Sequence, residues 1–152
     1  MDDGDTTLRG IEMSDDELER FLHEQGHGTL SLARDGEAYA VPISFGFDGE
    51  RVFFSLIEFG DASRKLDFVE HTDRACLVTY DVQTRHVWKS ALVLGSLASV
   101  DEDEHDHIAQ VLEDNAWFPN IYPPIRPITG IHRMALTPVE VTGRKGEGYQ
   151  SN

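Results

Sequence analysis

Lysine and cysteine are the residues that this chain uses most sparingly. Its 152 residues include three lysines, Lys65, Lys89 and Lys145, and one cysteine, Cys76. A single cysteine excludes a disulfide within the chain, and no apolar run is long enough to cross a membrane as a helix. No amino-terminal leader pattern is recognised either, so we expect a cytoplasmic protein without a membrane partner.

Positive charge as a whole is scarce. The chain has 28 acidic residues against 13 Lys and Arg, which gives a net charge of -15. Because such a surface repels phosphate backbones, we expect no nucleic-acid partner. An acidic, lysine-poor surface is also typical of proteins that must stay hydrated in concentrated salt, so we expect a halophilic source.

The length and the pattern of apolar residues predict a single domain. We expect residues 1–12 to be a disordered acidic terminus, residues 13–145 to form the domain and residues 146–152 to be a loose tail. Ser14 begins a helix capping box and Gly26 ends that helix. Residues 23–27 match the zinc-protease pattern H-E-x-x-H, but Gly26 separates the two histidines, so we predict no metal site.

Two Asp-Gly pairs, at residues 35–36 and 48–49, stand between alternating apolar runs and predict two-residue hairpin turns. Counting outward from each turn places the large apolar residues on one face, which we assign to the core. The predicted cross-strand pairs are Leu30–Val41, Leu32–Tyr39, Phe45–Val52, Ile43–Phe54 and Val41–Leu56.

The opposite face of these three strands is small and polar, and a flat ligand could lie on it. Pro42 belongs to this face and cannot donate a hydrogen bond to a neighbouring strand, which places it at a sheet edge or a bulge. The face comprises Thr29, Ser31, Ala33, Ala38, Ala40, Pro42, Ser44, Gly46, Phe53 and Ser55.

A helix is predicted to follow the second hairpin, capped by Asp61 or Ser63. Arg64 and Lys65 then occupy its first turn, where the helix dipole disfavours cations unless an anion is bound. A phosphate is the natural anion. The alternative is that both side chains extend into water.

This order of features resembles the flavin-binding segment of the pyridoxamine phosphate oxidase-like family, the FMN-binding split barrels. The resemblance covers roughly residues 15–145 and implies an FMN cofactor and a homodimer with the flavin between two chains. It implies that Phe54, Ser55, Ser63, Arg64 and Lys65 hold the FMN phosphate and that Pro42, Ile43 and Ser44 support the isoalloxazine ring, while Trp88, Ser90 or residues 117–122 reach the partner's flavin.

Further strands are expected over residues 74–80, 85–100 and 131–142, with an acidic helix that starts at Asp101. The fold class is therefore mainly β with flanking helices, an antiparallel split β-barrel of the FMN-binding type. The resemblance implies an oxidoreductase in which the flavin carries the chemistry for a small-molecule substrate.

Two departures from the family's namesake argue against pyridoxamine phosphate oxidase activity. Gly46 stands where the namesake's flavin-binding strand has a basic residue, and residues 131–142 lack its basic substrate motif. No catalytic acid or base stands out. Two alternatives remain open, a module that binds or stores flavin without turnover and a binder of haem or a deazaflavin on the same fold.

The acidic composition leads to a prediction on salt. Lowering the salt from 1 M to 0.01 M lengthens the Debye length from about 3 Å to about 30 Å, so repulsion among carboxylates then acts across the whole surface. The melting temperature should therefore rise steeply with KCl up to molar concentration in thermal unfolding scans. A melting temperature that is flat over this range would contradict the halophilic interpretation.

Overall fold

A computed structural model describes residues 10–58, 64–115 and 130–149 of the chain. The elements are β1 (Ile11–Glu12), α2 (Asp15–Gln25), β2 (His27–Arg34), β3 (Glu37–Phe47), β4 (Val52–Glu58), α3 (Arg64–His71), β5 (Ala75–Thr84), β6 (Val87–Ser99), η1 (Glu102–Glu104), α4 (His105–Asn115), β7 (Gly130–Lys145) and η2 (Glu147–Tyr149). None of the described helices is long and apolar enough to span a membrane.

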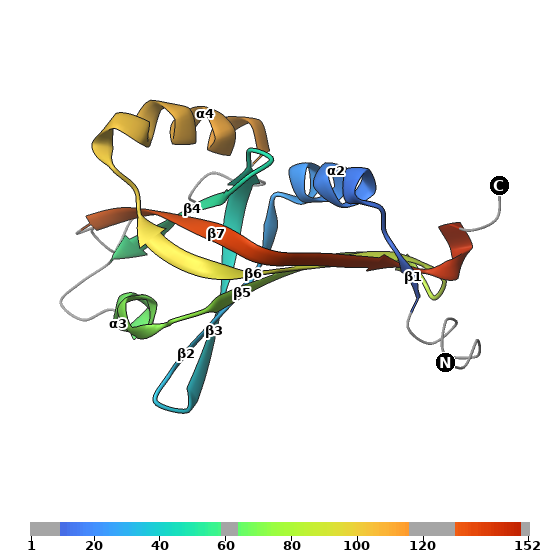
Figure 1. Ribbon diagram of the computed structural model, residues 1–152, viewed down its shortest axis with the longest axis horizontal. Coiled ribbons are helices and arrows are strands. Elements are labelled where there is room, and N and C mark those ends of the chain that lie inside the picture. The colour runs from blue at the N-terminus through green and yellow to red at the C-terminus, as the bar shows by residue number, and fades with distance from the viewer. Residues whose placement is uncertain (1–9, 59–63, 116–129, 150–152) are drawn as a thin grey trace, which may run out of the picture.

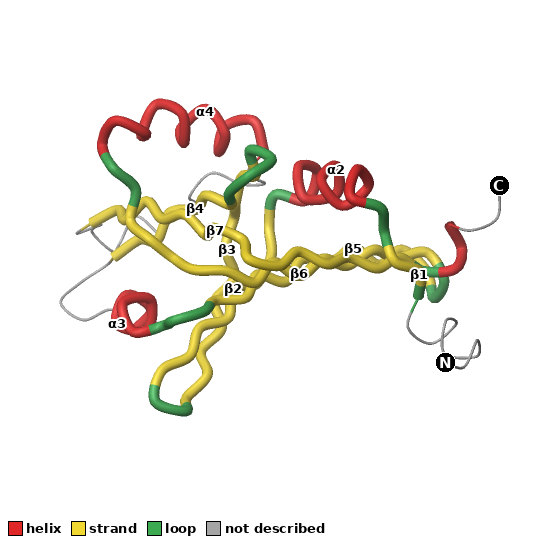
Figure 2. The backbone as a smooth tube through the Cα atoms, in the orientation of Figure 1, coloured by secondary structure: helices red, strands yellow, loops and turns green. Residues whose placement is uncertain are grey.

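The strands form a closed antiparallel ring (Figures 1 and 2). The order is β1-β7-β4-β3-β2-β5-β6, and a further pairing of β6 with β7 closes it. Two of the ladders between neighbouring strands are short. Strand β3 pairs with β4 only from Phe45 to Phe47, and β2 pairs with β5 only from Thr29 to Ser31. This architecture confirms the predicted mainly antiparallel split barrel.

The first hairpin turn is as predicted. Asp35 and Gly36 both have positive φ, at 47° and 81°, as a two-residue turn of this kind requires. Leu30 pairs with Val41 and Leu32 pairs with Tyr39, so the predicted register of β2 and β3 is confirmed.

The predicted register of the second hairpin is wrong by two residues. Phe47 pairs with Val52 and Phe45 pairs with Phe54, because the loop spans residues 48–51 rather than two residues. The Asp48 carboxylate accepts hydrogen bonds from the backbone N–H groups of Glu50 and Arg51 at 2.9 and 2.8 Å, which holds the wider loop. A shift by two keeps every side chain on its predicted face.

The core lies inside the ring, where alternate residues of each strand point inward. Phe45, Phe54, Leu77, Val93 and Leu136 are fully buried there. Each such side chain contributes roughly 1.5–3 kcal/mol by leaving water. Helix α2 covers one side of this core with Leu18, Phe21 and Leu22, and α3 covers another with Phe68 and Val69.

Both ends of the described chain extend beyond the predicted domain limits of 13 and 145. Ile11 and Glu12 form β1, which pairs with Lys145 and Arg144 at the end of β7. After β7, the backbone N–H of Gly146 donates to the carbonyl of Trp88 at 2.8 Å. Ladder pairing therefore orders short segments that have no local sequence periodicity of their own.

Glu17 ties the start of α2 to the end of β7. Its carboxylate accepts hydrogen bonds from the Lys145 ammonium and from the backbone N–H of Ser14, completing the capping box with the Ser14 side chain. The Lys145 hydrogen bond, followed by the Ser14 one, lowers the pKa of Glu17 from 4.5 to about 2. The ionised carboxylate therefore favours the folded state.

We expect Glu17→Gln to lower the free energy of unfolding by about 1–2 kcal/mol at neutral pH. Because the folded pKa is depressed, this difference is fully present above about pH 5 and shrinks as pH falls toward 2. Urea unfolding of both proteins at a series of pH values measures it, with the exposed Glu24→Gln as the control. A difference that stays the same at every pH would contradict the assignment.

Candidate functional site

Helix α4 covers part of the face on which a flat ligand was expected. A Cβ on Gly46 would lie 2.8 Å from both Cγ1 and the carbonyl oxygen of Val111, so only glycine lets α4 approach β3 this closely. Phe53, Ile108, Val111 and Ala135 form a second apolar cluster there. At Gly46 and Phe53 the expectation is therefore wrong, because the small residue accommodates a helix rather than a ligand.

Polar contacts hold α4 and η1 against the β3–β4 loop. Arg51 donates to Glu104 at 2.6 Å, and Nε2 of His107 lies 3.0 Å from Oδ2 of Asp48. Burial raises the pKa of Asp48, but hydrogen bonds from the Arg51 backbone, His107 and the Glu50 backbone outweigh burial and lower it overall. Asp48 is therefore a structural anion and not a proton donor at neutral pH.

The rest of this outer face remains open. Two rows of small and aliphatic side chains cross β3, β2, β5 and β6, and we call them the open face. Leu92 is 46% exposed in it, and the other members are exposed or half-buried. The rows are Ala40–Ser31–Cys76–Leu94 and Pro42–Thr29–Val78–Leu92.

The open face contains one residue with a shifted pKa. Burial raises the pKa of the Cys76 thiol, so the thiol stays protonated and acts as a small apolar side chain. The other resolved shifts belong to groups outside this face: Glu17, Asp48, Arg51 and Glu104.

The residues predicted to support the flavin ring divide between the two faces of β3. Ile43 is 6% exposed and points into the core, so only its backbone could contact a ligand. Pro42 is exposed on the open face. Ser44 is half-buried, and its hydroxyl donates to the carbonyl of Gly26 at 3.2 Å.

Pro42 lies where the sequence placed it, at a sheet edge. It pairs with Thr29 on β2, but β3 meets β4 only from Phe45 onward, so Pro42 has no strand neighbour on that side among the described residues. The N–H group that proline lacks therefore costs no hydrogen bond between β3 and β4.

The two cationic residues that were predicted to bind a phosphate lie at the start of α3. Arg64 is the first helical residue, its side chain is 69% exposed, and it lies 3.7 Å from Glu37. Lys65 follows and is half-buried. Asp67, the acidic residue of this first turn, already pairs with Arg34, so that carboxylate does not neutralise the cations. Ser63 lies outside the described residues.

Phe54 and Ser55 point in opposite directions. Phe54 is fully buried in the core, so its ring positions β4 and does not face a ligand. Ser55 points outward, is half-buried and lies directly opposite Arg133 of β7. The end of β4, the start of β7 and α3 lie at the same end of the molecule (Figure 1).

Arg133, the cation that lies opposite Ser55, could not be associated with it from the sequence. Its place beside Ser55 depends on the pairing of β4 with β7, two strands that are far apart in the chain. No local pattern in the sequence specifies that pairing, so only the closed ring reveals it.

Trp88 and Ser90 lie far from these residues within one chain. A Cβ on Gly10 would lie 2.6 Å from the Trp88 ring, and Ser90 pairs with Arg144 near the end of β7. Both contacts place the two residues beside β1, at the opposite end of the molecule from α3 (Figure 1). One chain does not bring Trp88 and Arg64 together.

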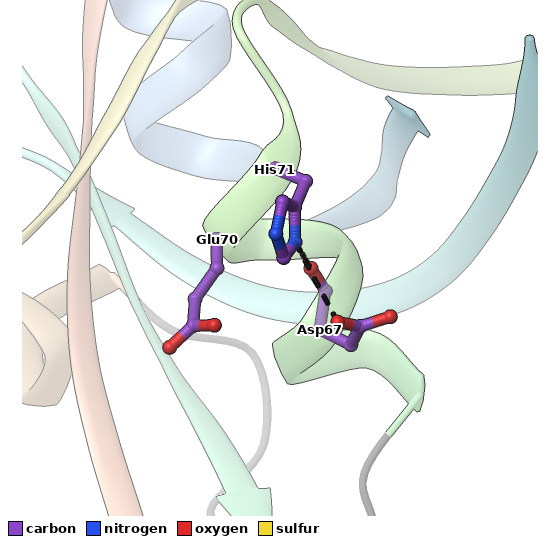
Figure 3. Close-up of side chains that lie close together, drawn as sticks. All are labelled: Asp67, Glu70 and His71. Atoms are coloured by element: carbon purple, nitrogen blue, oxygen red, sulfur yellow. Dashed lines mark hydrogen bonds and ion pairs between the residues drawn. The ribbon is translucent and has the colours of Figure 1, made fainter. Parts of the chain in front are cut away.

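One cluster among the described residues has ligand atoms close enough for a metal ion, namely Asp67, Glu70 and His71 of α3 (Figure 3). Asp67 already pairs with Arg34, and Nδ1 of His71 lies 2.8 Å from the Asp67 carbonyl oxygen. These contacts are ordinary for the surface of a helix, so we assign no metal to them.

Comparison with known proteins agrees with this fold. The family model described as pyridoxamine 5'-phosphate oxidase matches residues 14–145. No curated protein matches the chain.

Similar solved structures include three flavin-related proteins. An FAD-binding protein of Mesorhizobium loti has 19% identity and a TM-score of 0.67, over 89% of this chain and 96% of that one. An FAD-binding protein of Mycobacterium smegmatis has 16% identity and a TM-score of 0.66, over 90% and 98%. An FAD- and haem-binding protein of the same organism has 17% identity and a TM-score of 0.67, over 89% and 72%.

These structures share the fold of this chain at low sequence identity. The family match rests on the sequence itself and extends from the cap of α2 to the last residue of β7. The chain therefore belongs to the pyridoxamine 5'-phosphate oxidase-like family.

Proposed function

We propose that this chain binds a flavin by its FMN moiety and acts as a cytoplasmic oxidoreductase on a small molecule, without pyridoxamine phosphate oxidase activity. The observation that carries the proposal is the pair of cations, Arg64 and Lys65, in the first turn of α3, whose acidic residue Asp67 already pairs with Arg34. A terminal phosphate complements both the two cations and the positive end of the helix dipole. The similar FAD-binding proteins support a flavin ligand.

The residues present fit such a ligand. Ser55 offers a hydroxyl on the outer face of β4, and the open face offers a flat surface of small side chains at Pro42 and Thr29. A bound flavin supplies the transfer of electrons. The chain orients the ring, anchors the phosphate and excludes water from one side of the ring.

Two copies of the chain make a complete site in this proposal. Trp88 and Ser90 lie at the opposite end of the chain from Arg64, so they can approach the same flavin only from a partner. The open face with Leu92 is the surface that a second copy would cover, because a contiguous aliphatic surface is seldom left in water. We therefore propose a homodimer.

Flavin binding without turnover is the second candidate. No described residue of the open face has a pKa shift of the kind expected for a general acid or base, since the shifted Cys76 thiol is only made less acidic. A carrier or store of flavin needs no such group. Adding a nicotinamide donor and then an acceptor distinguishes the two, because only an enzyme should cycle between reduced and oxidised spectra.

The phosphate anchor is tested by Arg64→Ala together with Lys65→Ala. We expect FMN affinity to fall by about 100-fold or more, because two charge-assisted hydrogen bonds are lost, while riboflavin affinity changes little. Calorimetric titration of both ligands measures this. Arg20→Ala with Arg85→Ala removes the same charge from exposed positions outside α3 and serves as the control. Equal losses for FMN and riboflavin would argue against a phosphate site.

The dimer is tested by Leu92→Glu, which places a charge at the β6 end of the open face. Light scattering in molar KCl should give twice the chain mass of 17.1 kDa for the wild type and the chain mass for the variant. Gln110→Glu adds the same charge to the exposed side of α4 and should remain dimeric. A wild-type monomer that still holds flavin would refute the shared site.

A further inference from the structure

The tip of the β2–β3 hairpin extends beyond its neighbouring strands, with α3 beside it (Figure 1). We call residues 32–41 the hairpin arm. Within the described parts of the chain, the pairing of β2 with β5 stops at Ser31 and the pairing of β3 with β4 starts only at Phe45. The arm therefore has no strand neighbour on either side, and its position depends on contacts from other elements.

Side chains of α3 supply such contacts. Tyr39 of the arm stacks on Phe68 of α3, with the ring centres 5.1 Å apart and the ring planes inclined by 26°. Arg34 forms an ion pair with Asp67, and its guanidinium carbon lies 4.6 Å from the centre of the same Phe68 ring. The arm and α3 therefore pack as one unit.

Arg64, the cation proposed to anchor the phosphate, also contacts the arm. Its Nη2 lies 3.7 Å from Oε2 of Glu37, and its guanidinium carbon lies 5.8 Å from the centre of the Tyr39 ring. An aromatic ring attracts a cation within about 6 Å. Glu37 thus offers Arg64 the negative charge that a phosphate would offer, and Tyr39 keeps the guanidinium close to it.

The contact between Glu37 and Arg64 is weak enough for a ligand to displace it. Both side chains are mostly exposed, at 61% and 69%, and the contribution of such a pair is small. A phosphate monoester carries about 1.5–2 negative charges at neutral pH and can accept two parallel hydrogen bonds from one guanidinium group. Phosphate is therefore the stronger partner for Arg64.

We propose that the hairpin arm regulates the phosphate anchor: Glu37 and Tyr39 hold Arg64 until a phosphate binds, and the bound phosphate draws Arg64 away and loosens the arm. This inference rests on the proposed flavin function. The coupling is reciprocal, because the factor by which the arm weakens phosphate binding is also the factor by which bound phosphate weakens the contact between Arg64 and the arm.

The first test is calorimetric titration with FMN and riboflavin at one fixed salt concentration. Glu37→Gln should raise FMN affinity about two- to fivefold, the value of one exposed ion pair, and leave riboflavin affinity unchanged. In an Arg64→Ala background the same substitution should leave FMN affinity unchanged, because the contact is already lost. Asp35→Asn removes the same charge from an exposed position of the arm that has a φ of 47°, which asparagine tolerates, and should leave FMN affinity nearly unchanged.

The second test is hydrogen exchange, which measures the reciprocal effect on the arm. The backbone amides of residues 32–41 should exchange about two- to fivefold faster with FMN bound than with riboflavin bound. The amides of α2 should exchange equally in both complexes. Equal exchange of the arm in the two complexes would show that Arg64 stays on the arm, and would overturn the inference.

The inference would also be overturned if the Glu37→Gln effect persists without Arg64 or is reproduced by Asp35→Asn, because a general effect of charge would then explain it. If Glu37→Gln changes nothing while Arg64→Ala lowers FMN affinity alone, the inference is wrong and the phosphate anchor stands. If Arg64→Ala lowers the affinities for FMN and riboflavin equally, or lowers neither, the proposed phosphate anchor is wrong as well.

Discussion

The pairing of β7 with strands on both of its sides is the constraint on which the rest of the structure depends. From Gly130 to Leu136 it pairs with β4, and from Met134 to Lys145 it pairs with β6. These ladders close the ring and enclose the core. They also bring Arg133 beside Ser55 and Lys145 beside Glu17, so the proposed ligand site and the anchoring of α2 both follow from one strand.

Much of the fold was predictable because the informative patterns were local. The Asp35-Gly36 turn, the alternation along β2 and β3, and the capping box at Ser14 depend on neighbours within a few residues, and the structure confirms all three. The second hairpin was predicted less well, because Asp48 uses its side chain to hold a wider loop that the Asp-Gly pair alone does not reveal.

The candidate site was harder to predict, because its parts meet through long-range contacts. Gly46 was assigned to a ligand surface, whereas it makes room for Val111 of α4, which comes much later in the chain. The pairing of Ser55 with Arg133 could not be predicted for the same reason, because β4 and β7 are far apart in the chain. The cations of α3 could be recognised, since their conflict with the helix dipole is visible in consecutive residues.

The edge of β3 that lies beyond its short pairing with β4 has a consequence for aggregation. Within the part of the chain that the structure describes, residues 37–43 have no strand partner on the β4 side, and such an edge can recruit a strand from another molecule. Pro42 lies within this edge and has no N–H group to donate to an incoming strand. It therefore disfavours pairing with another molecule, in addition to forming part of the open face. Replacing Pro42 to probe flavin contacts would therefore also restore an edge N–H group that a strand of another molecule can pair with. The resulting aggregation would lower the amount of bound flavin and could be mistaken for a loss of flavin affinity.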